Sequence, residues 1–179
     1  MNRFRFFFVL ALVLVVPASA LAQVQQVLQK KATDYRSKAM ADHTAMIDKY
    51  GQVVGDVDNL NDQIADLTTR YNAVKNNLNA NQQKAVEDGL KKNKSVWTTN
   101  KDLLIQGGEI YKKRSFATNN LSAGDLAYKN TQWQAAVTEY GSCTSNAKIA
   151  LRDLDKASAS VNAALLFGKV VEKIIQSGE

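Results

Sequence analysis

Apolar side chains in the first half of this chain recur with a regularity that few folds can accommodate. From residue 46 to residue 78 they alternate at intervals of four and three: Met46, Tyr50, Val53, Val57, Leu60, Ile64, Leu67, Tyr71, Val74 and Leu78. This spacing keeps them on one side of an α-helix and makes a heptad seam of more than four repeats. Charged and amide side chains fill positions between them, so we predict a long helix with one packed face and a solvated remainder.

A second seam with the same spacing occupies the last third of the chain. Its members are Trp133, Ala136, Tyr140, Cys143, Ala147, Ala150, Leu154, Ala157, Val161, Ala164, Gly168, Val171 and Ile175. Small residues dominate its middle, and they allow a partner helix to approach closely. A less regular set between the two seams predicts a third helix, broken near Gly107-Gly108: Val86, Leu90, Trp97, Leu104 and Tyr111.

Long helices are permitted because no proline follows Pro17. The period-two alternation of Val, Ile and Thr that announces strands is also missing. The first helix is expected to begin near Val24 and to run unbroken to Leu78. The alternative is a bend or turn near Gly51, because Gly51 and Gly55 each weaken a helix by about 1 kcal/mol relative to alanine.

Two polar segments are predicted to be turns between these helices. Residues 76–82 contain four asparagines, a residue type that favours turns. Residues 115–124 form the second predicted turn, with Ser122 or Asp125 available as the N-cap of the last helix.

The charge distribution predicts how the first helices pair. Residues 42–68 hold six aspartates and one lysine, whereas residues 84–114 hold eight lysines or arginines and four acids. The acidic segment should therefore attract the basic one when the chain turns back. Each exposed pair of opposite charges contributes only about 0–1 kcal/mol, so these charges select which helices pair more than they stabilise the fold. We therefore predict an all-α fold, an elongated antiparallel bundle of three or four long helices with coiled-coil-like packing.

The N-terminus has the layout of a secretory signal peptide. Arg3 and Arg5 precede eleven apolar residues, 6–16, and the small-residue tripeptide 20–22 follows Pro17. Eleven residues are too few to span a bilayer core of about 30 Å. Cleavage after Ala22 is therefore expected, with an uncleaved anchor or a buried helix as the alternatives. No cysteine follows the cleavage site, which argues against a lipid anchor.

Residues 23–179 are expected to form a single helical-bundle domain with no stable membrane span, located in the periplasm or secreted. Without residues 1–22 the chain has 21 basic and 17 acidic residues, a net charge of +4. Mild basicity identifies no partner. A nucleic-acid-binding protein would need these charges gathered into one patch with aromatics between them, so nucleic acid is not an expected partner.

Cys143 is the only cysteine, so neither an internal disulfide nor a thiolate metal cluster can form. Its seam position favours burial, and a disulfide between two chains is the alternative. Nucleophilic catalysis needs a base beside the nucleophile, and His43, the only histidine, is far from Cys143 in sequence. Neighbouring carboxylates such as Asp56 and Asp58 are expected on solvated helix surface. The sequence therefore predicts no enzyme and no catalytic residues.

One group of side chains is a candidate metal site. Met40, His43 and Met46 recur every three residues, and this soft set of ligands is of the kind that holds Cu(I). Non-covalent haem is a weaker form of the same hypothesis. Because the first seam extends backwards to His43 and Ala39, packing in the core is the alternative, and no cofactor is predicted.

Residues 128–140, YKNTQWQAAVTEY, resemble the turn and second helix of a tetratricopeptide repeat. With Cys143 as the last matching packing position, the resemblance covers about sixteen residues, and it departs from the family's pattern at two positions. Thr131 replaces the usual turn glycine, Lys148 stands where a closing proline is expected, and no second copy occurs at the period of 34 residues. It implies that the last helix breaks near Asn130 and that the bundle has four helices.

The C-terminal stretch carries apolar residues on more than one helix face. They are Leu165, Leu166, Phe167, Val170 and Ile174, and they predict burial in the bundle, docking on a partner or on a second copy, or contact with a membrane surface. The leading functional hypothesis is a non-enzymatic scaffold, adaptor or chaperone-like protein of the bacterial cell envelope that binds another protein. The alternatives are a copper- or haem-binding bundle around His43 and a homo-oligomer that mates through Ala147 and Ala150.

Overall fold

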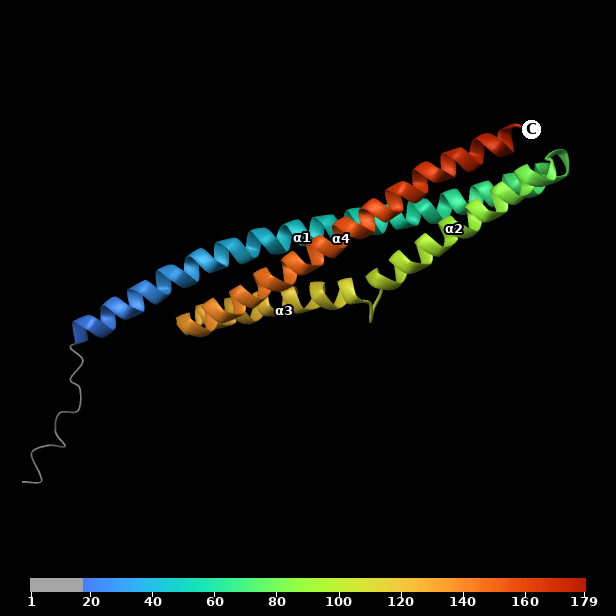
Figure 1. Ribbon diagram of the computed structural model, residues 1–179. Helices are drawn as coiled ribbons and strands as arrows, with labels where there is room; N and C mark the ends of the chain where they lie inside the picture. The colour runs from blue at the N-terminus through green and yellow to red at the C-terminus, as the bar shows by residue number, and fades with distance from the viewer. Residues whose placement is uncertain (1–17) are drawn as a thin grey trace, which may run out of the picture.

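The computed structural model describes residues 18–179, and four α-helices make up nearly all of this part of the chain (Figure 1). They are α1 (Ala18–Val74), α2 (Ala80–Leu104), α3 (Glu109–Lys129) and α4 (Trp133–Gln176), with a short 3₁₀ turn, η1 (Lys75–Asn77), after α1. Residues 18–179 contain no strand. The prediction of an all-α bundle with three or four long helices is confirmed.

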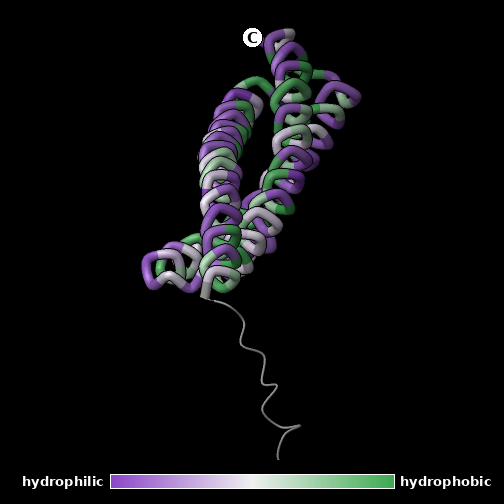
Figure 2. The backbone as a smooth tube through the Cα atoms, turned by 90° about the vertical axis from the view of Figure 1, so that its left-hand side faces the viewer, coloured by the Kyte–Doolittle hydropathy of each residue, from purple (hydrophilic) through white to green (hydrophobic). Residues whose placement is uncertain are grey.

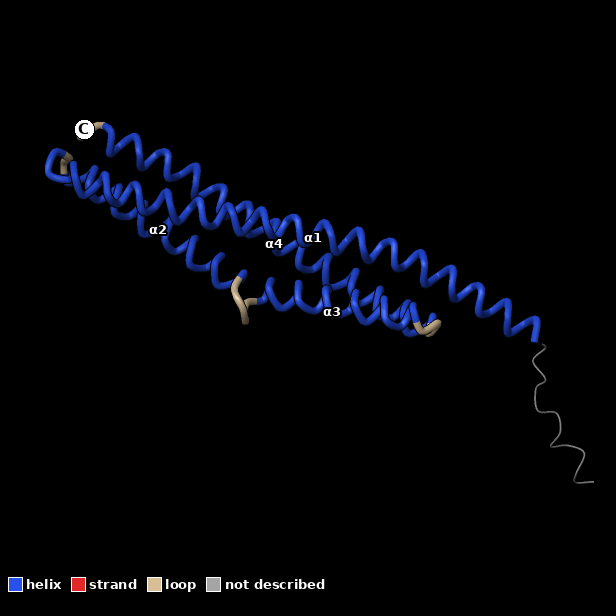
Figure 3. Tube along the Cα trace, turned by 180° about the vertical axis from the view of Figure 1, so that it is seen from behind, coloured by secondary structure: helices blue, strands red, loops and turns tan. Residues whose placement is uncertain are grey.

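The four helices form three rods. α1 and α4 are the two long ones, whereas α2 and α3 follow one another along the third rod, which bends where they meet (Figure 1). Breaks in the helical trace occur only at residues 75–79, 105–108 and 130–132 within the described segment, apart from its C-terminal end (Figure 3).

The two longest helices run in the same direction, which the sequence did not predict. Gln63 on α1 donates to the carbonyl of Leu165, and Arg70 pairs with Glu172, so both contacts join positions 102 residues apart. A chain with three rods and two reversals makes its first and third rods parallel. Rods that follow one another along the chain run in opposite directions, but α1 and α4 pack against each other in parallel. The bundle is therefore not antiparallel throughout, and coiled-coil-type packing stays a prediction.

α1 is continuous through Gly51 and Gly55, where an added Cβ would meet no atom of the described residues within 4 Å. The alternative of a bend near Gly51 is therefore not observed. The predicted turn at residues 76–82 is present, although α2 already begins at Ala80. Asn79 caps α2 by accepting from the Gln82 backbone N–H at 3.0 Å, and the Gln82 side chain accepts from the Asn79 backbone in return.

The second predicted turn, at residues 115–124, is wrong because this segment lies inside α3. Its hydroxyl side chains bond back to their own helix, as Thr118 does to the Arg114 carbonyl and Ser122 to the Thr118 carbonyl. Asp125 pairs with Arg36 instead of capping a helix. The predicted break near Gly107-Gly108 is confirmed at residues 105–108, where Gly107 has φ +93° and a Cβ on Gly108 would collide with the end of α2.

The break at residues 130–132 agrees with the one implied by the tetratricopeptide resemblance. Thr131 stands in the place of the turn glycine and adopts φ 58°, a left-handed conformation that is unfavourable for a β-branched residue. The neighbouring rings of Tyr128 and Trp133 meet edge to face with centroids 5.1 Å apart.

Both apolar seams face the inside of the bundle. In the first seam only Tyr50 and Ile64 are half-buried and the others are buried, and in the second seam only Trp133 is half-buried. Hydrophilic and hydrophobic residues accordingly alternate along every helix (Figure 2). The apolar run 6–16 and Pro17 lie outside the described residues, whereas α1 already includes residues 20–22. Signal-peptide cleavage therefore stays a prediction.

Candidate binding groove between α1 and α2

A groove runs between α1 and α2, and none of its lining residues belongs to α4. It has two sections of about 470 and 560 Å³, which share Asn61 and Trp97. We call the whole feature the α1–α2 groove. Its apolar lining consists of Tyr50, Val54, Val57, Ile64, Ala65 and Tyr71 from α1, Leu90, Trp97 and Leu104 from α2, and Ile105 and Tyr111 beyond it.

The groove follows from how α2 sits on the first seam. Tyr50 and Ile64 occupy the same heptad position as Val57 and Tyr71, which are buried, yet they stay half-buried. α4 and α2 together cover the centre of the α1 seam and leave its edge open toward solvent. Tyr50 and Ile64, which the spacing predicted as core residues, therefore line the groove instead.

Two tyrosines bridge the groove from α1. The Tyr50 hydroxyl donates to the carbonyl of Leu104 at the end of α2. The Tyr71 hydroxyl donates to Glu87 at 2.8 Å near the start of α2. Burial raises the pKa of Tyr71, and Glu87 adds to the shift, so this phenol remains a donor at neutral pH. The bridges fix the spacing of the two helices near both ends of the groove.

Cationic groups line the α2 side of the groove. Lys91, Lys94 and Lys101 line it, and within residues 18–179 none of them forms an ion pair. Lys101 lies over the Trp97 ring at 4.7 Å from its centroid. Arg114 lies outside the lining but stacks on Tyr50 at 4.2 Å, which places a further cation at this end. The acids in the lining are Asp58 and Glu87.

The structure separates the three residues of the candidate metal site. Met46 is fully buried, whereas Met40 is 47 % exposed on the same helix. His43 Nε2 lies 2.9 Å from the Thr118 hydroxyl on α3, and burial lowers its pKa. Among residues 18–179, no cluster of three or more histidine, cysteine, aspartate or glutamate side chains could hold a metal ion. Metal or haem binding at His43 stays a prediction.

The five C-terminal residues of the predicted interaction set divide into two groups. Leu165, Phe167 and Ile174 are half-buried and pack against the core. Leu166 and Val170 are 63 % and 52 % exposed on the outer side of α4. Burial in the bundle therefore accounts for three of them, and the two exposed side chains remain a small surface for docking.

Cys143 is buried, as its seam position predicted, and its thiol faces the Ala39 carbonyl at 3.8 Å. Burial raises its pKa to about 11, and nearby Asp42 contributes to the shift, so the thiol is protonated at neutral pH. Ala147 and Ala150 are fully buried within the chain as well. The seam that the homo-oligomer alternative would use is therefore covered by the protein's own helices.

The α1–α2 groove is the feature that sequence analysis missed. The available signals were the aromatic residues Tyr50, Trp97 and Tyr111, together with the lysines of α2.

No family model, curated protein or solved structure matches this chain. Within residues 18–179, no helix has both the length and the apolar character needed to cross a membrane.

Proposed function

We propose that this protein is a non-enzymatic helical interaction protein, exported to the cell envelope, that binds a segment of another protein in the α1–α2 groove. The observation that carries the proposal is an apolar helix seam left open along one edge and bordered by three lysines without ion-pair partners in the described chain. Contiguous exposed apolar surface rimmed by polar side chains is typical of protein interaction sites.

The groove is also preorganised for binding. The Tyr50 and Tyr71 bridges tie α1 to α2 on either side of its centre. Binding therefore requires no separation or ordering of the two walls, and this lowers the entropic cost of association. A scaffold or adaptor role needs no group that changes protonation near neutral pH, and it is compatible with the solvated carboxylates along the rest of the molecule.

The test is site-specific photo-crosslinking in cells that produce the protein. A crosslinking side chain at Asn61, which lines both sections of the groove, is compared with one at the neighbouring exposed Asp62, which lines neither. We expect adducts with a different protein from position 61 alone, and their loss when Leu90→Glu is added. Equal adducts from both positions, or none from position 61, would contradict the proposal, and an adduct of twice the chain mass would indicate self-association.

A further inference from the structure

The groove also indicates which kind of segment it binds. We infer, on the basis of the proposed function, that the occupant is an amphipathic α-helix of a partner protein, with an apolar stripe and a row of carboxylates facing α2. Three features of the groove support this: its helical walls, its length and its charge.

The walls favour a helical occupant over an extended one. Apart from residues 105 and 106 they are α-helical, with backbone N–H and C=O groups already bonded within their own helices. They offer no strand edge to which an extended segment could add, whereas a helix satisfies its own backbone hydrogen bonds. A helix in this position would become the fourth rod of the bundle.

The length of the groove fits such a helix. Along α1 its lining runs from Tyr50 to Asn72. At 1.5 Å per residue this is roughly 33 Å, the length of about six helical turns. The aromatic section around Trp97 and Tyr111 can receive one large side chain of the occupant, and the section around Ile64 and Leu90 can receive the following turns of its apolar stripe.

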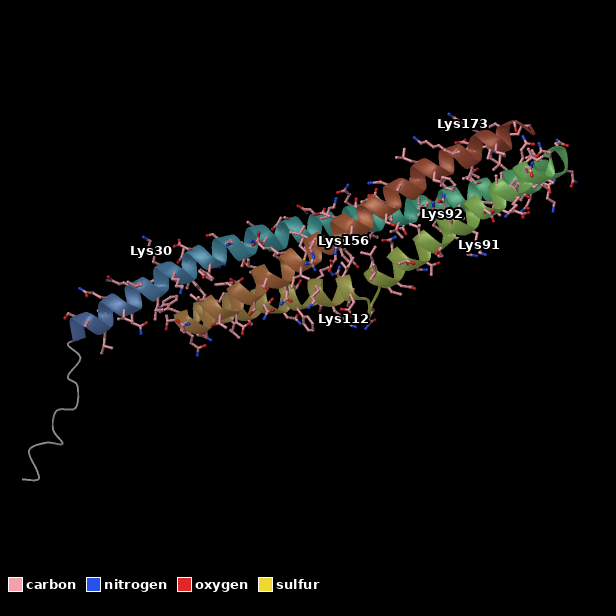
Figure 4. All side chains as sticks on the ribbon, in the orientation of Figure 1. Lys30, Lys91, Lys92, Lys112, Lys156 and Lys173 are labelled. Carbon is pink, nitrogen blue, oxygen red and sulfur yellow. The ribbon has the colours of Figure 1, made fainter. Side chains whose placement is uncertain are left out.

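The charge of the groove selects the edge residues of the occupant. Lys91, Lys94 and Lys101 extend over roughly 15 Å of α2. Lys91 is seen on α2, next to Lys92 (Figure 4). The two lining acids are Asp58 and Glu87, which accepts from Tyr71, so the three lysines outnumber the carboxylates of the lining. The α2 side therefore attracts acidic side chains and repels a basic helix.

The experiment uses Trp97 as an internal reporter. Replacing the only other tryptophan, Trp133→Phe, leaves Trp97 as the sole indole in the full mature chain. The probes are two synthetic 21-residue amphipathic peptides with the same leucine stripe, one with glutamate and one with lysine at the edge positions, and a third acidic peptide with a central proline. Binding is followed by Trp97 emission and by isothermal titration calorimetry.

We expect the acidic peptide to bind about tenfold more tightly than the basic one, because three exposed charge pairs contribute modestly and additively. The triple variant Lys91→Glu, Lys94→Glu, Lys101→Glu should reverse this order. The matched control, Lys30→Glu, Lys156→Glu, Lys173→Glu, changes the net charge equally at lysines that do not line the groove (Figure 4), and it should keep the order. The peptide with proline should not bind.

Each other outcome overturns the inference in a distinct way. Equal binding of the two charged peptides would show that the lysines do not select the partner, while groove binding itself would stand. A Trp97 response to anionic phosphatidylglycerol vesicles and to neither peptide would identify a lipid-binding surface. If no probe binds, the helical occupant is excluded, and the crosslinks from position 61 decide independently whether the groove binds a protein at all.

Discussion

α2 and α3 lie along the same rod but are buried against α1 and α4 by different kinds of side chain. At seven-residue intervals α3 buries Ile110, Ala117 and Gly124, whereas α2 buries Val86, Asn93 and Asn100. The small residues of α3 allow close approach, and Gly124 rests against the Tyr140 ring, which a Cβ would approach to 2.6 Å. The asparagines of α2 place polar groups at the corresponding buried positions of that helix.

Only one of those asparagines donates to another helix, because Asn100 donates to the Val96 carbonyl of α2 itself. Asn93 donates to the Ala164 carbonyl at 3.1 Å, while its own side-chain oxygen is buried and has no hydrogen-bond partner within residues 18–179. A buried asparagine fixes the register of packed helices because any other alignment leaves more polar groups unpaired. The comparison shows that buried residues at the same seven-residue interval can pack a helix closely, as in α3, or leave part of the interface open, as in α2. The groove lies on the α2 segment.

The largest effect is expected from added bulk in the close-packed segment. Ala150 is fully buried, so Ala150→Leu should lower the free energy of unfolding by about 3 kcal/mol through overpacking. The control is Asn61→Leu, which adds bulk in the open groove and should change it by less than about 0.5 kcal/mol. Urea unfolding followed by circular dichroism measures both, and equal losses would remove the contrast between the two segments.

A matched pair of glycines gives the next largest effect. Gly124→Ala should destabilise the protein by about 1–2 kcal/mol, because the new methyl group meets the rigid Tyr140 ring. Gly55→Ala, in open space within α1, should instead stabilise it by about 0.5–1 kcal/mol through helix propensity. Thermal melts distinguish the two signs, and a stable Gly124→Ala variant would show that α3 has room to move away from α4.

The long helices and their buried faces could be predicted from the sequence, but the arrangement of the helices could not. The spacing from Met46 to Leu78 and from Trp133 to Ile175 correctly marked the buried sides, because helical periodicity is a local property. The parallel direction of α1 and α4 depends on the number of chain reversals, and the turn at 115–124 was placed wrongly because hydroxyl and amide residues favour turns in general.

The groove was unpredictable for a related reason. Spacing reports which face of a helix is apolar, but it carries no information on how far a neighbouring helix covers that face. Tyr50 and Val53 are both members of the first apolar seam, yet only Val53 is fully buried. The charge pattern predicts that the basic α2 segment pairs with α1, but which of its lysines line the groove depends on how α2 packs against α1.

A smaller effect is expected at the polar contact that joins α3 to both long helices. Asp125 accepts from Arg36 and from Tyr140, each at 2.8 Å. Burial alone would raise the pKa of Asp125, but these two hydrogen bonds, aided by Lys129, outweigh it and leave the pKa below its ordinary value. Asp125→Asn should therefore cost about 1 kcal/mol at pH 6, a modest value because the Arg36–Asp125 pair is partly exposed.

The pH dependence of that loss follows from the direction of the shift. The lowered pKa makes the contribution of Asp125 complete above its unfolded value of about 4, and the contribution is lost as the pH falls through the folded value. The stability gap between the wild type and Asp125→Asn should accordingly narrow below about pH 4 in urea titrations. Asp48→Asn, at an exposed carboxylate, serves as the control, and a gap that widens in acid would contradict the assignment.

The smallest effect is expected at Asn93, the buried asparagine of α2 that contacts α4. Asn93→Leu removes an unpaired buried oxygen and places an apolar side chain of similar size at a heptad position, so it should raise the free energy of unfolding by about 0.5–1 kcal/mol. If Asn93 fixes the register, the same variant should weaken peptide binding in the groove even though the fold is more stable. Measuring urea unfolding and peptide affinity on one sample separates these effects. A variant that is both more stable and fully competent to bind would show that Asn93 does not position α2.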